Sequence, residues 1–166
     1  MPRRNLLTPA ERTSLLAFPA TDDEFIQHYT FSESDLSVIR QRRGSHNRLG
    51  FAVQLCYLRY PGFALPTDAE PPASLLKIVG RQLRIEPDIW SQYAQRPETR
   101  REHLLELQAW LKLTPFAVAD YRHFVHQLAE LAQQTDRGIV LAEALVELLR
   151  QQRIILPTVD VIERVC

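Results

Sequence analysis

Apolar residues recur along the chain at spacings of three and four positions, which places side chains on one face of a helix. Between residues 97 and 112, Leu104, Leu107 and Leu111 form such a stripe. No run of five or six residues alternates β-branched and polar side chains as a half-buried strand would. The pattern therefore predicts an all-α fold, a compact multi-helix cluster with helix-turn-helix-like units and no sheet.

Helix starts are marked by polar capping residues. Thr8 with Glu11 and Thr21 with Glu24 have the spacing of capping boxes, and SESD at 32–35 is a weaker version. Thr114 before Pro115 is expected to open a later helix in the same way. Together these signals predict helices over residues 9–17, 22–29, 33–42, 46–60, 73–84, 87–95, 97–112, 115–134 and 137–153.

Prolines separate the helical stretches. FALPTDAEPPA, at 63–73, cannot continue a helix and is expected to be a surface connector. After Pro157 one more short helix is predicted, with an apolar face of Val161, Ile162 and Val165. Little chain follows to cover that face, so the ending is expected to be a truncation.

Charge and composition narrow the classes of function. Twenty basic and twenty acidic residues cancel, so any binding to DNA or anionic lipid must be local. Cys56 and Cys166 form neither a disulfide framework nor a metal motif, which favours a reducing cytoplasm. No signal peptide and no run of about 18 apolar residues is present, so the protein is expected to be cytoplasmic, without a membrane span.

One stretch breaks the charge balance. Residues 38–62 hold five arginines and a histidine, and no carboxylate occurs between Asp35 and Asp68. Arg48 and Arg59 lie eleven positions apart and fall on the same side of the predicted helix, within about 20°. Upstream, Gly44 interrupts a group that we call the basic turn, residues 40–48: Arg40, Arg42, Arg43, His46, Asn47 and Arg48.

Two interpretations of the basic turn remain open. A helix, a short glycine-containing turn and a second helix, which Asn47 could cap, is the arrangement of DNA-binding helix-turn-helix units. Its arginines would then hold phosphates. Alternatively the turn is solvated, and its arginines pair with Glu24, Glu33 or other acids of neighbouring helices. The long acid-free run favours nucleic acid.

A second basic group mixes both signs. RPETRREHL holds Arg96, Arg100 and Arg101, but Glu98, Glu102 and Glu106 lie among them at pairing distance along the helix. Self-pairing is the preferred interpretation, with a secondary DNA contact for Arg100 and Arg101. Arg3 and Arg4 could form a basic arm.

Signals for chemistry are weak. Asp120, His123 and His126 lie within two turns, yet His126 falls on a different face, so solvated histidines are preferred over a metal site. No phosphate-binding loop, zinc-protease motif or nucleophile elbow occurs. No active site, cofactor or metal is therefore expected.

Four segments carry a resemblance to a known family. LLTPAERTSLLAFP, HYTFSESDLSVIRQRRGSHNRLGFAVQLCYLRYPG, RPETRREHLLELQAWLKLTPF and RIILPTVDVIER resemble, in order and spacing, the N-terminal region of the transposases of class II replicative transposons, the Tn-three family. The second segment is the most specific. One departure is LKLTPF at 111–116, where glycine and arginine would be expected in place of Lys112 or Leu113 and Thr114.

The resemblance implies a DNA-binding module that recognises the terminal inverted repeats of a transposon, without the catalytic acidic residues, which lie elsewhere in such proteins. It implies a first helical module over residues 1–134 and the start of a second, truncated one over 137–166. Self-association is expected only through other parts of a transposase. The residues expected to contact double-stranded DNA are Arg40, Arg42, Arg43, His46, Asn47, Arg48, Arg59, Arg100 and Arg101.

Two rival functions stay open. A helical protein-interaction module would dock a partner on the Val161, Ile162 and Val165 face or on the 63–73 connector. A metal-dependent enzyme would require Asp120 and His123 to converge with further ligands.

Overall fold

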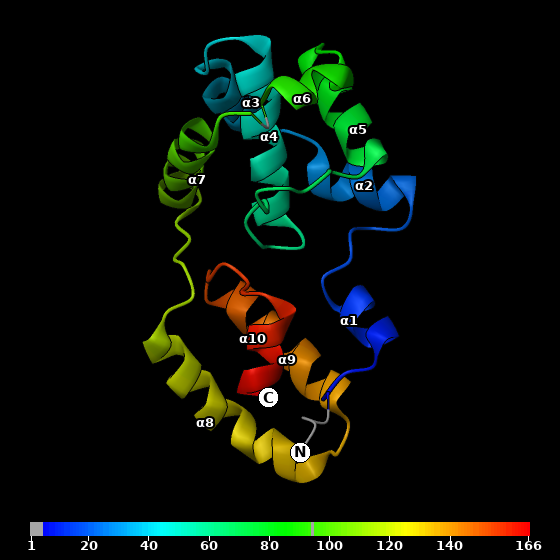
Figure 1. Cartoon of the computed structure of the whole chain (residues 1–166), viewed down its shortest axis with the longest axis vertical. Helices are drawn as coiled ribbons and strands as arrows, with labels where there is room; N and C mark the ends of the chain where they lie inside the picture. The colour runs from blue at the N-terminus through cyan, green and yellow to red at the C-terminus, as the bar shows by residue number, and fades with distance from the viewer. Residues whose placement is uncertain (1–4, 94) are drawn as a thin grey trace. The chain divides into compact units, whose positions relative to one another are not determined.

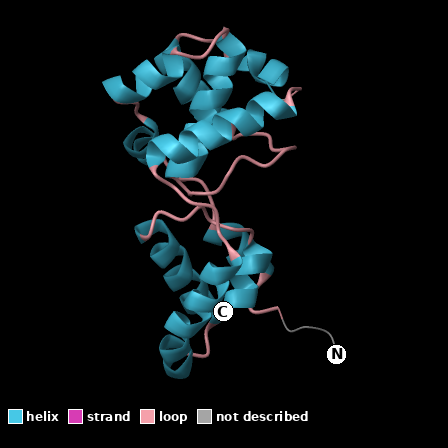
Figure 2. Cartoon of the chain, turned by 90° about the vertical axis from the view of Figure 1, so that its left-hand side faces the viewer, coloured by secondary structure: helices cyan, strands magenta, loops and turns pink. Residues whose placement is uncertain are grey.

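The computed structural model describes residues 5–93 and 95–166, and over these residues it is built from helices joined by loops, with no strand (Figures 1 and 2). Within the same residues, one isolated bridge pairs Thr114 with Ile154 in parallel. The all-α prediction is confirmed. Arg3 and Arg4 lie outside the described residues.

The helices follow the predicted order. Their bounds are α1 Pro9–Leu15, α2 Asp22–Tyr29, α3 Glu33–Arg40, α4 Ser45–Arg59, α5 Ala73–Leu83, the 3-10 helix η1 Pro87–Ile89, α6 Trp90–Tyr93, α7 Pro97–Leu111, α8 Val118–Gln134, α9 Gly138–Gln151 and α10 Val159–Val165. Within the part of the chain that the structure describes, none of them is both long and apolar enough to cross a bilayer.

The predicted capping boxes are present. The Thr8 hydroxyl accepts from the Glu11 amide at 3.2 Å, and the Glu11 carboxylate accepts from the Thr8 amide at 2.8 Å. The same exchange opens α2 at Thr21 and α3 at Ser32. Local side-chain chemistry therefore fixes the beginnings of the first three helices.

The start of α8 differs from the prediction, because Thr114 does not open it. The Thr114 amide donates to the Arg153 carbonyl at 3.0 Å, and its carbonyl accepts from the Ile155 amide at 2.9 Å. This bridge holds the backbone extended. The helix begins at Val118 instead, where the Asp120 carboxylate accepts from the Ala117 amide at 2.8 Å.

The chain divides into two compact units. Unit 1 comprises the residues up to Ala17, Pro61–Phe63 and Leu113–Cys166, and unit 2 comprises Phe18–Tyr60 and Ala64–Lys112. The boundary expected near residues 134–137 falls inside unit 1. The reason is that α8 and α9, on its two sides, bury their apolar faces in one core.

Unit 1 has a core formed by α8, α9 and α10. Phe124, Leu145 and Leu149 are fully buried there. Ile162 and Val165 of α10 are also buried, so the apolar face expected to be uncovered is covered, and only Val161 stays half-buried. At the surface, the Arg12 guanidinium pairs with Asp160 at 2.7 Å and with Glu163 at 2.5 Å.

Unit 2 is built around α4. Every residue from Leu49 to Leu58 is buried, since α2, α3, α5, α6 and α7 all pack against this helix. Gly50 allows the closest approach, because a Cβ atom there would lie 2.2 Å from ring carbons of Tyr93. Close packing at the centre of unit 2 therefore requires a residue without a side chain at position 50.

A buried polar network joins α4, α6 and α7. The Tyr93 hydroxyl contacts Gln54 Nε2 at 2.6 Å and His103 Nδ1 at 2.9 Å. Gln54 also donates to the Arg100 carbonyl at 3.0 Å. Burial, together with the nearby Arg42 guanidinium, lowers the pKa of His103 to about 4, so the imidazole is neutral at pH 7.

Gly50→Ala should destabilise the protein although alanine is the better helix former. Helix propensity alone would favour alanine by about 1 kcal/mol, but the clash with Tyr93 is expected to lower the free energy of unfolding by about 1–3 kcal/mol. Urea denaturation followed by circular dichroism measures the change. In a Tyr93→Ala background the penalty should vanish; an equal penalty there would exclude the clash as its cause.

His103 should make the stability fall on acidification. Above its ordinary pKa of 6.5 the imidazole is neutral in both states, so the stability is fully present. Between about pH 6.5 and pH 4 the unfolded chain binds a proton that the folded chain does not, which should remove about 3 kcal/mol. Urea denaturation at several pH values should show a flatter profile for His103→Asn. Parallel profiles would assign the loss to other groups.

Candidate nucleic-acid interface

The basic turn connects α3 to α4 through a tight backbone. Gly44 has φ 84° and ψ 147°, a conformation that favours glycine, and the His46 ring would lie 3.2 Å from a Cβ at this position. The Arg48 amide donates to the Gly44 carbonyl at 3.1 Å and so starts the helical hydrogen bonds of α4. Two helices joined by a short glycine turn are thus present.

Asn47 has a different role from the one expected. Gly44 stands at the N-cap of α4, and no side chain caps this helix. Asn47 lies in the first turn, where its Nδ2 donates to the Arg43 carbonyl at 2.8 Å. The Asn47 amide therefore fixes the backbone of the basic turn.

The burial of α4 limits what this helix can offer to DNA. A recognition helix of a helix-turn-helix unit presents side chains to the major groove. Because Leu49–Leu58 are buried inside unit 2, only the first turn of α4, residues 45–48, and Arg59 at its end reach solvent. Within α4, the residues open to a partner are therefore those of the first turn and Arg59.

Arg59, one of the residues expected to contact DNA, is held by a buried carboxylate of α3. Its two terminal nitrogens donate to the two oxygens of Asp35, both at 2.6 Å, and the Asp35 side chain is only 3% exposed. Burial alone would raise the pKa of Asp35, but hydrogen bonds from Arg59 and Ser32 hold it below its usual value. Arg59 is therefore a structural residue.

Arg42 is also engaged within the protein. Its guanidinium forms an ion pair with Glu106 of α7 and lies over the Phe51 ring, 4.7 Å from the centroid. Its carbonyl accepts from Arg48 Nε at 3.0 Å. The acids that neutralise arginines here are thus Asp35 of α3 and Glu106 of α7, which belong to neighbouring helices, in place of Glu24 or Glu33.

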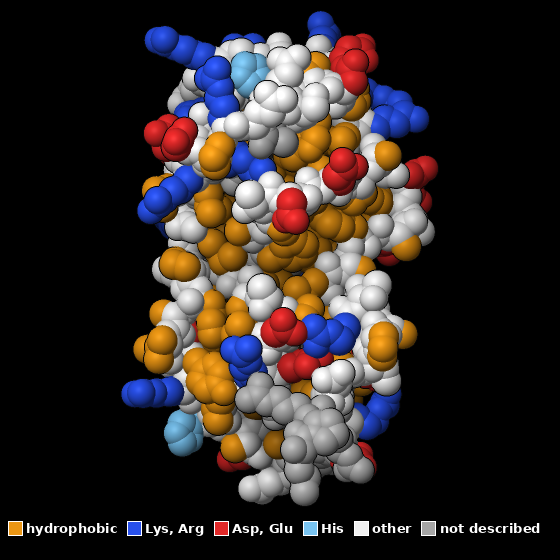
Figure 3. Space-filling model, viewed as in Figure 1, with side chains coloured by type: hydrophobic (Ala, Val, Ile, Leu, Met, Phe, Trp, Pro, Cys, Tyr) orange, Lys and Arg blue, Asp and Glu red, His pale blue; other side chains and the backbone are white. Residues whose placement is uncertain are grey.

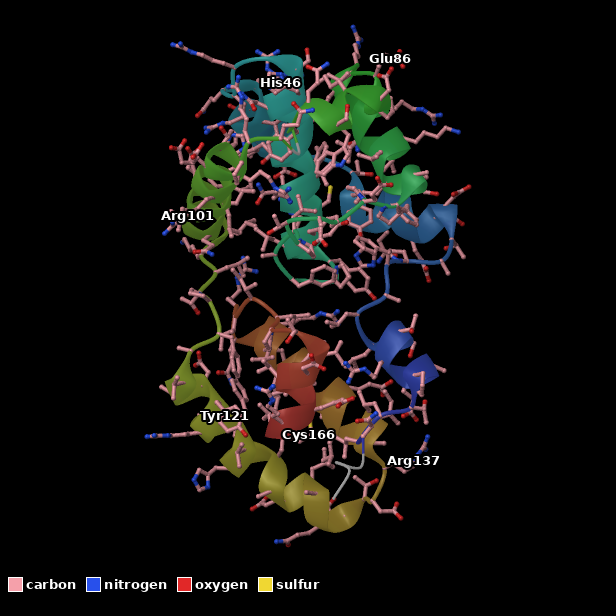
Figure 4. All side chains as sticks on the ribbon, in the orientation of Figure 1. His46, Glu86, Arg101, Tyr121, Arg137 and Cys166 are labelled. Atoms are coloured by element: carbon pink, nitrogen blue, oxygen red, sulfur yellow. The ribbon has the colours of Figure 1, made fainter. Side chains whose placement is uncertain are left out.

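Arg100 and Arg101 of α7 differ in their surroundings. Arg100 is 8% exposed and donates to the carbonyls of Pro66 and Thr67, both at 2.6 Å, which ties the connector to α7. Its guanidinium is therefore engaged within unit 2. Arg101 is exposed along α7 (Figure 4). Over the described residues it forms no ion pair, so the expected pairing with Glu98, Glu102 and Glu106 is absent.

The remaining arginines of the basic turn carry no compensating acid. Arg40 and Arg43 are exposed and Arg48 is half-buried; none of the three forms an ion pair with a described carboxylate. In Figure 3, Lys and Arg side chains stand out at the upper end of unit 2, where Figure 4 places His46. The basic turn therefore exposes uncompensated positive charge.

One basic residue near this turn was missed from the sequence. Arg84, directly after α5, lines a groove of about 570 Å³ together with Arg40 and Arg48. Figure 4 places Glu86, two residues further on, at the same end of unit 2 as His46. The sequence signal that could have indicated Arg84 is GRQLRIEP at the end of α5. There an arginine stands at the left-handed position that glycine commonly fills.

The residues weighed as metal ligands, Asp120, His123 and His126, do not form such a site in the described structure. Among the described side chains, no group of three or more His, Cys, Asp and Glu gathers as it would around a metal ion. Asp120 caps α8, while His123 and His126 are exposed. The geometry gives the metal-enzyme interpretation no support.

Comparison with known proteins adds a family. The family described as "Domain of unknown function (DUF4158)" matches residues 6–166. The chain is 60% identical over 164 residues to the transposase for transposon Tn3926 of Escherichia coli. It is 54% identical over 166 residues to the transposase for transposon Tn501 of Pseudomonas aeruginosa. It is 36% identical over 163 residues to the transposase for transposon Tn1546 of Enterococcus faecium.

These matches cover nearly the whole chain but a small part of each relative. The match to the Tn3926 transposase covers 99% of the chain and 17% of that transposase. For Tn501 the shares are 100% and 17%, and for Tn1546 they are 97% and 16%. The predicted resemblance to the N-terminal region of these transposases is confirmed.

Arginines that pair with a carboxylate and arginines that do not should differ in their effect on stability. Arg59→Met leaves the buried Asp35 carboxylate unpaired and is expected to lower the free energy of unfolding by about 1–3 kcal/mol. Arg43→Met should change it by less than about 0.5 kcal/mol. Urea denaturation at pH 7 measures both.

The Arg59→Met loss should shrink as the pH falls through the acid range. Asp35 has a lowered pKa, so the stability that its pairing provides is present above its ordinary pKa of 3.8 and is lost as it becomes protonated. Equal stabilities of Arg59→Met and Arg43→Met at pH 7 would refute the structural role of Arg59.

Proposed function

The chain belongs to the DUF4158 family and matches transposases over nearly its whole length, and from this premise we propose that it is a DNA-binding module of a replicative transposase that recognises the terminal inverted repeats of the transposon. The carrying observation is the uncompensated charge of the basic turn. Arg40, Arg43 and Arg48 have no described carboxylate partner, whereas Arg42 and Arg59 in the same stretch do.

Phosphate binding is the chemistry that these side chains suit best. A guanidinium presents several donors in a plane that matches the oxygens of a phosphate. Because the chain as a whole has no net charge, binding would depend on these local contacts and would weaken with salt. His46 and Asn47, half-buried on the first turn of α4, are the polar side chains that we assign to base edges beside these phosphates.

The proposal assigns recognition and no catalysis to this module. Metal-dependent strand cleavage would fall to other parts of a transposase, and self-association likewise. The two cysteines, Cys56 and Cys166, are unpaired, which suits the reducing cytoplasm in which a bacterial DNA-binding protein works. The nucleic-acid partner is double-stranded DNA.

The interaction module is the weaker alternative. Ile162 and Val165 are buried in the core of unit 1, so the face expected to dock a partner is already occupied. The 63–73 connector is held by Arg100 through the Pro66 and Thr67 carbonyls. The α10 face is therefore occupied within unit 1, and the connector, although exposed at residues 66–68 and 70, is anchored to α7.

Binding should require the exposed arginines of the basic turn. The full chain is titrated into a terminal inverted-repeat duplex and a scrambled duplex at several salt concentrations, with affinity read by fluorescence anisotropy. The inverted repeat should bind more tightly. Arg40→Ala and Arg43→Ala should weaken binding to both duplexes, each flattening the slope of log K against log salt by about 0.9.

An exposed arginine of unit 1 provides the matched control. Arg122→Ala removes the same charge from the surface of α8, and its affinity should stay close to that of the unaltered chain. If the unaltered chain ignored both duplexes at low salt, the DNA-binding function would be refuted. An equal loss for Arg43→Ala and Arg122→Ala would refute the assignment to the basic turn.

A further inference from the structure

Three helix ends of unit 2 meet at one groove. It is lined by Ile39 and Arg40 from the end of α3, Arg48 from the first turn of α4, Gln82 and Leu83 from the end of α5, and Arg84 and Ile85 after it. Three of these side chains are arginines and none is acidic. Its volume of about 570 Å³ lies within the range of pockets that hold small ligands.

The three arginines lack partners of opposite charge. Among the described residues, no carboxylate forms an ion pair with Arg40, Arg48 or Arg84. Glu86 follows closely in the sequence and lines a neighbouring hollow with Arg84, yet it does not pair with it. Three like charges around one hollow repel each other and favour an anion between them.

Within the groove, the arginine side chains are the hydrogen-bond donors available to a ligand. Gln82 is engaged elsewhere, because its Oε1 accepts from the Phe31 amide and its Nε2 donates to the Tyr29 carbonyl, both at 2.8 Å. Arg48 is restrained by its Nε bond to the Arg42 carbonyl, so less side-chain freedom is lost on binding. Buried Ile39 adds an apolar wall, which strengthens electrostatic attraction nearby.

We infer that this groove binds one phosphate of the DNA backbone, with Arg84 joining Arg40 and Arg48 around it. The inference rests on the proposed function and extends the interface to a residue 44 positions from Arg40 and 36 from Arg48. Arg84 would fix the register of the protein on the duplex, since phosphate contacts position a protein without reading sequence.

The backbone at Arg84 permits a clean test. Arg84 has φ 56° and ψ 46°, the left-handed conformation that glycine adopts without strain. Arg84→Gly should therefore remove the side chain without unfolding α5. Lys112 has the same φ and ψ at the end of α7, also in unit 2, and does not line the groove. Lys112→Gly is the matched control, with the same loss of charge in the same backbone conformation.

The experiment measures binding of the full chain to an inverted-repeat duplex as a function of salt. Arg84→Gly is expected to bind roughly tenfold more weakly than Lys112→Gly, with a slope of log K against log salt that is flatter by about 0.9. Duplexes with one phosphate neutralised as a methylphosphonate locate the contact. One position should weaken binding of the unaltered chain and of Lys112→Gly but not of Arg84→Gly.

Each other outcome is decisive. Equal binding by Arg84→Gly and Lys112→Gly, while Arg43→Ala is weakened, would overturn the groove and leave the proposed function intact. Failure of the unaltered chain to bind DNA would overturn both. If inorganic phosphate saturated the groove without affecting DNA binding, the groove would serve a free anion and its assignment to DNA would be overturned. Arg84→Asn, which also tolerates this conformation, replaces Arg84→Gly if that variant loses its fold.

Discussion

The burial of α4 on all its sides is the constraint on which unit 2 depends. From Leu49 to Leu58 no side chain of this helix reaches solvent, and Gly50 is needed for Tyr93 to pack against it. A helix so enclosed can carry polar function only at its ends. Of this helix, the first turn and Arg59 are therefore the parts that reach solvent, and Arg59 is already paired with Asp35.

Electrostatics then divides the arginines around α4 into two kinds. Arg42 and Arg59 meet Glu106 and the buried Asp35, and these pairs join α4 and the turn before it to α7 and α3. Arg40 and Arg43 are exposed without a described carboxylate, although they lie in the same short stretch. The first kind holds the fold together, and the second kind is available to an anion.

Sequence reasoning succeeded where the cause is local and failed where it is not. Capping boxes such as Thr8 with Glu11 involve neighbours in the chain, so the first three helix starts could be predicted. The start of α8 could not, because Thr114 is held extended by a segment about forty residues away. The same limit hid the partners of Arg42 and Arg59: an acid-free run in the sequence does not mean an acid-free surrounding in space. It also hid Arg84, whose proximity to Arg40 depends on how α5 packs.

The arginines of unit 2 that lack a carboxylate partner should respond to DNA, and those engaged within the protein should not. The most direct test is a titration of the full chain with an inverted-repeat duplex, followed through the guanidinium signals of individual arginines by nuclear magnetic resonance. Signals of Arg40, Arg43, Arg48 and Arg84 should shift, while those of Arg42, Arg59 and Arg100 stay in place. Shifts confined to the second set, or spread evenly over both, would contradict the account.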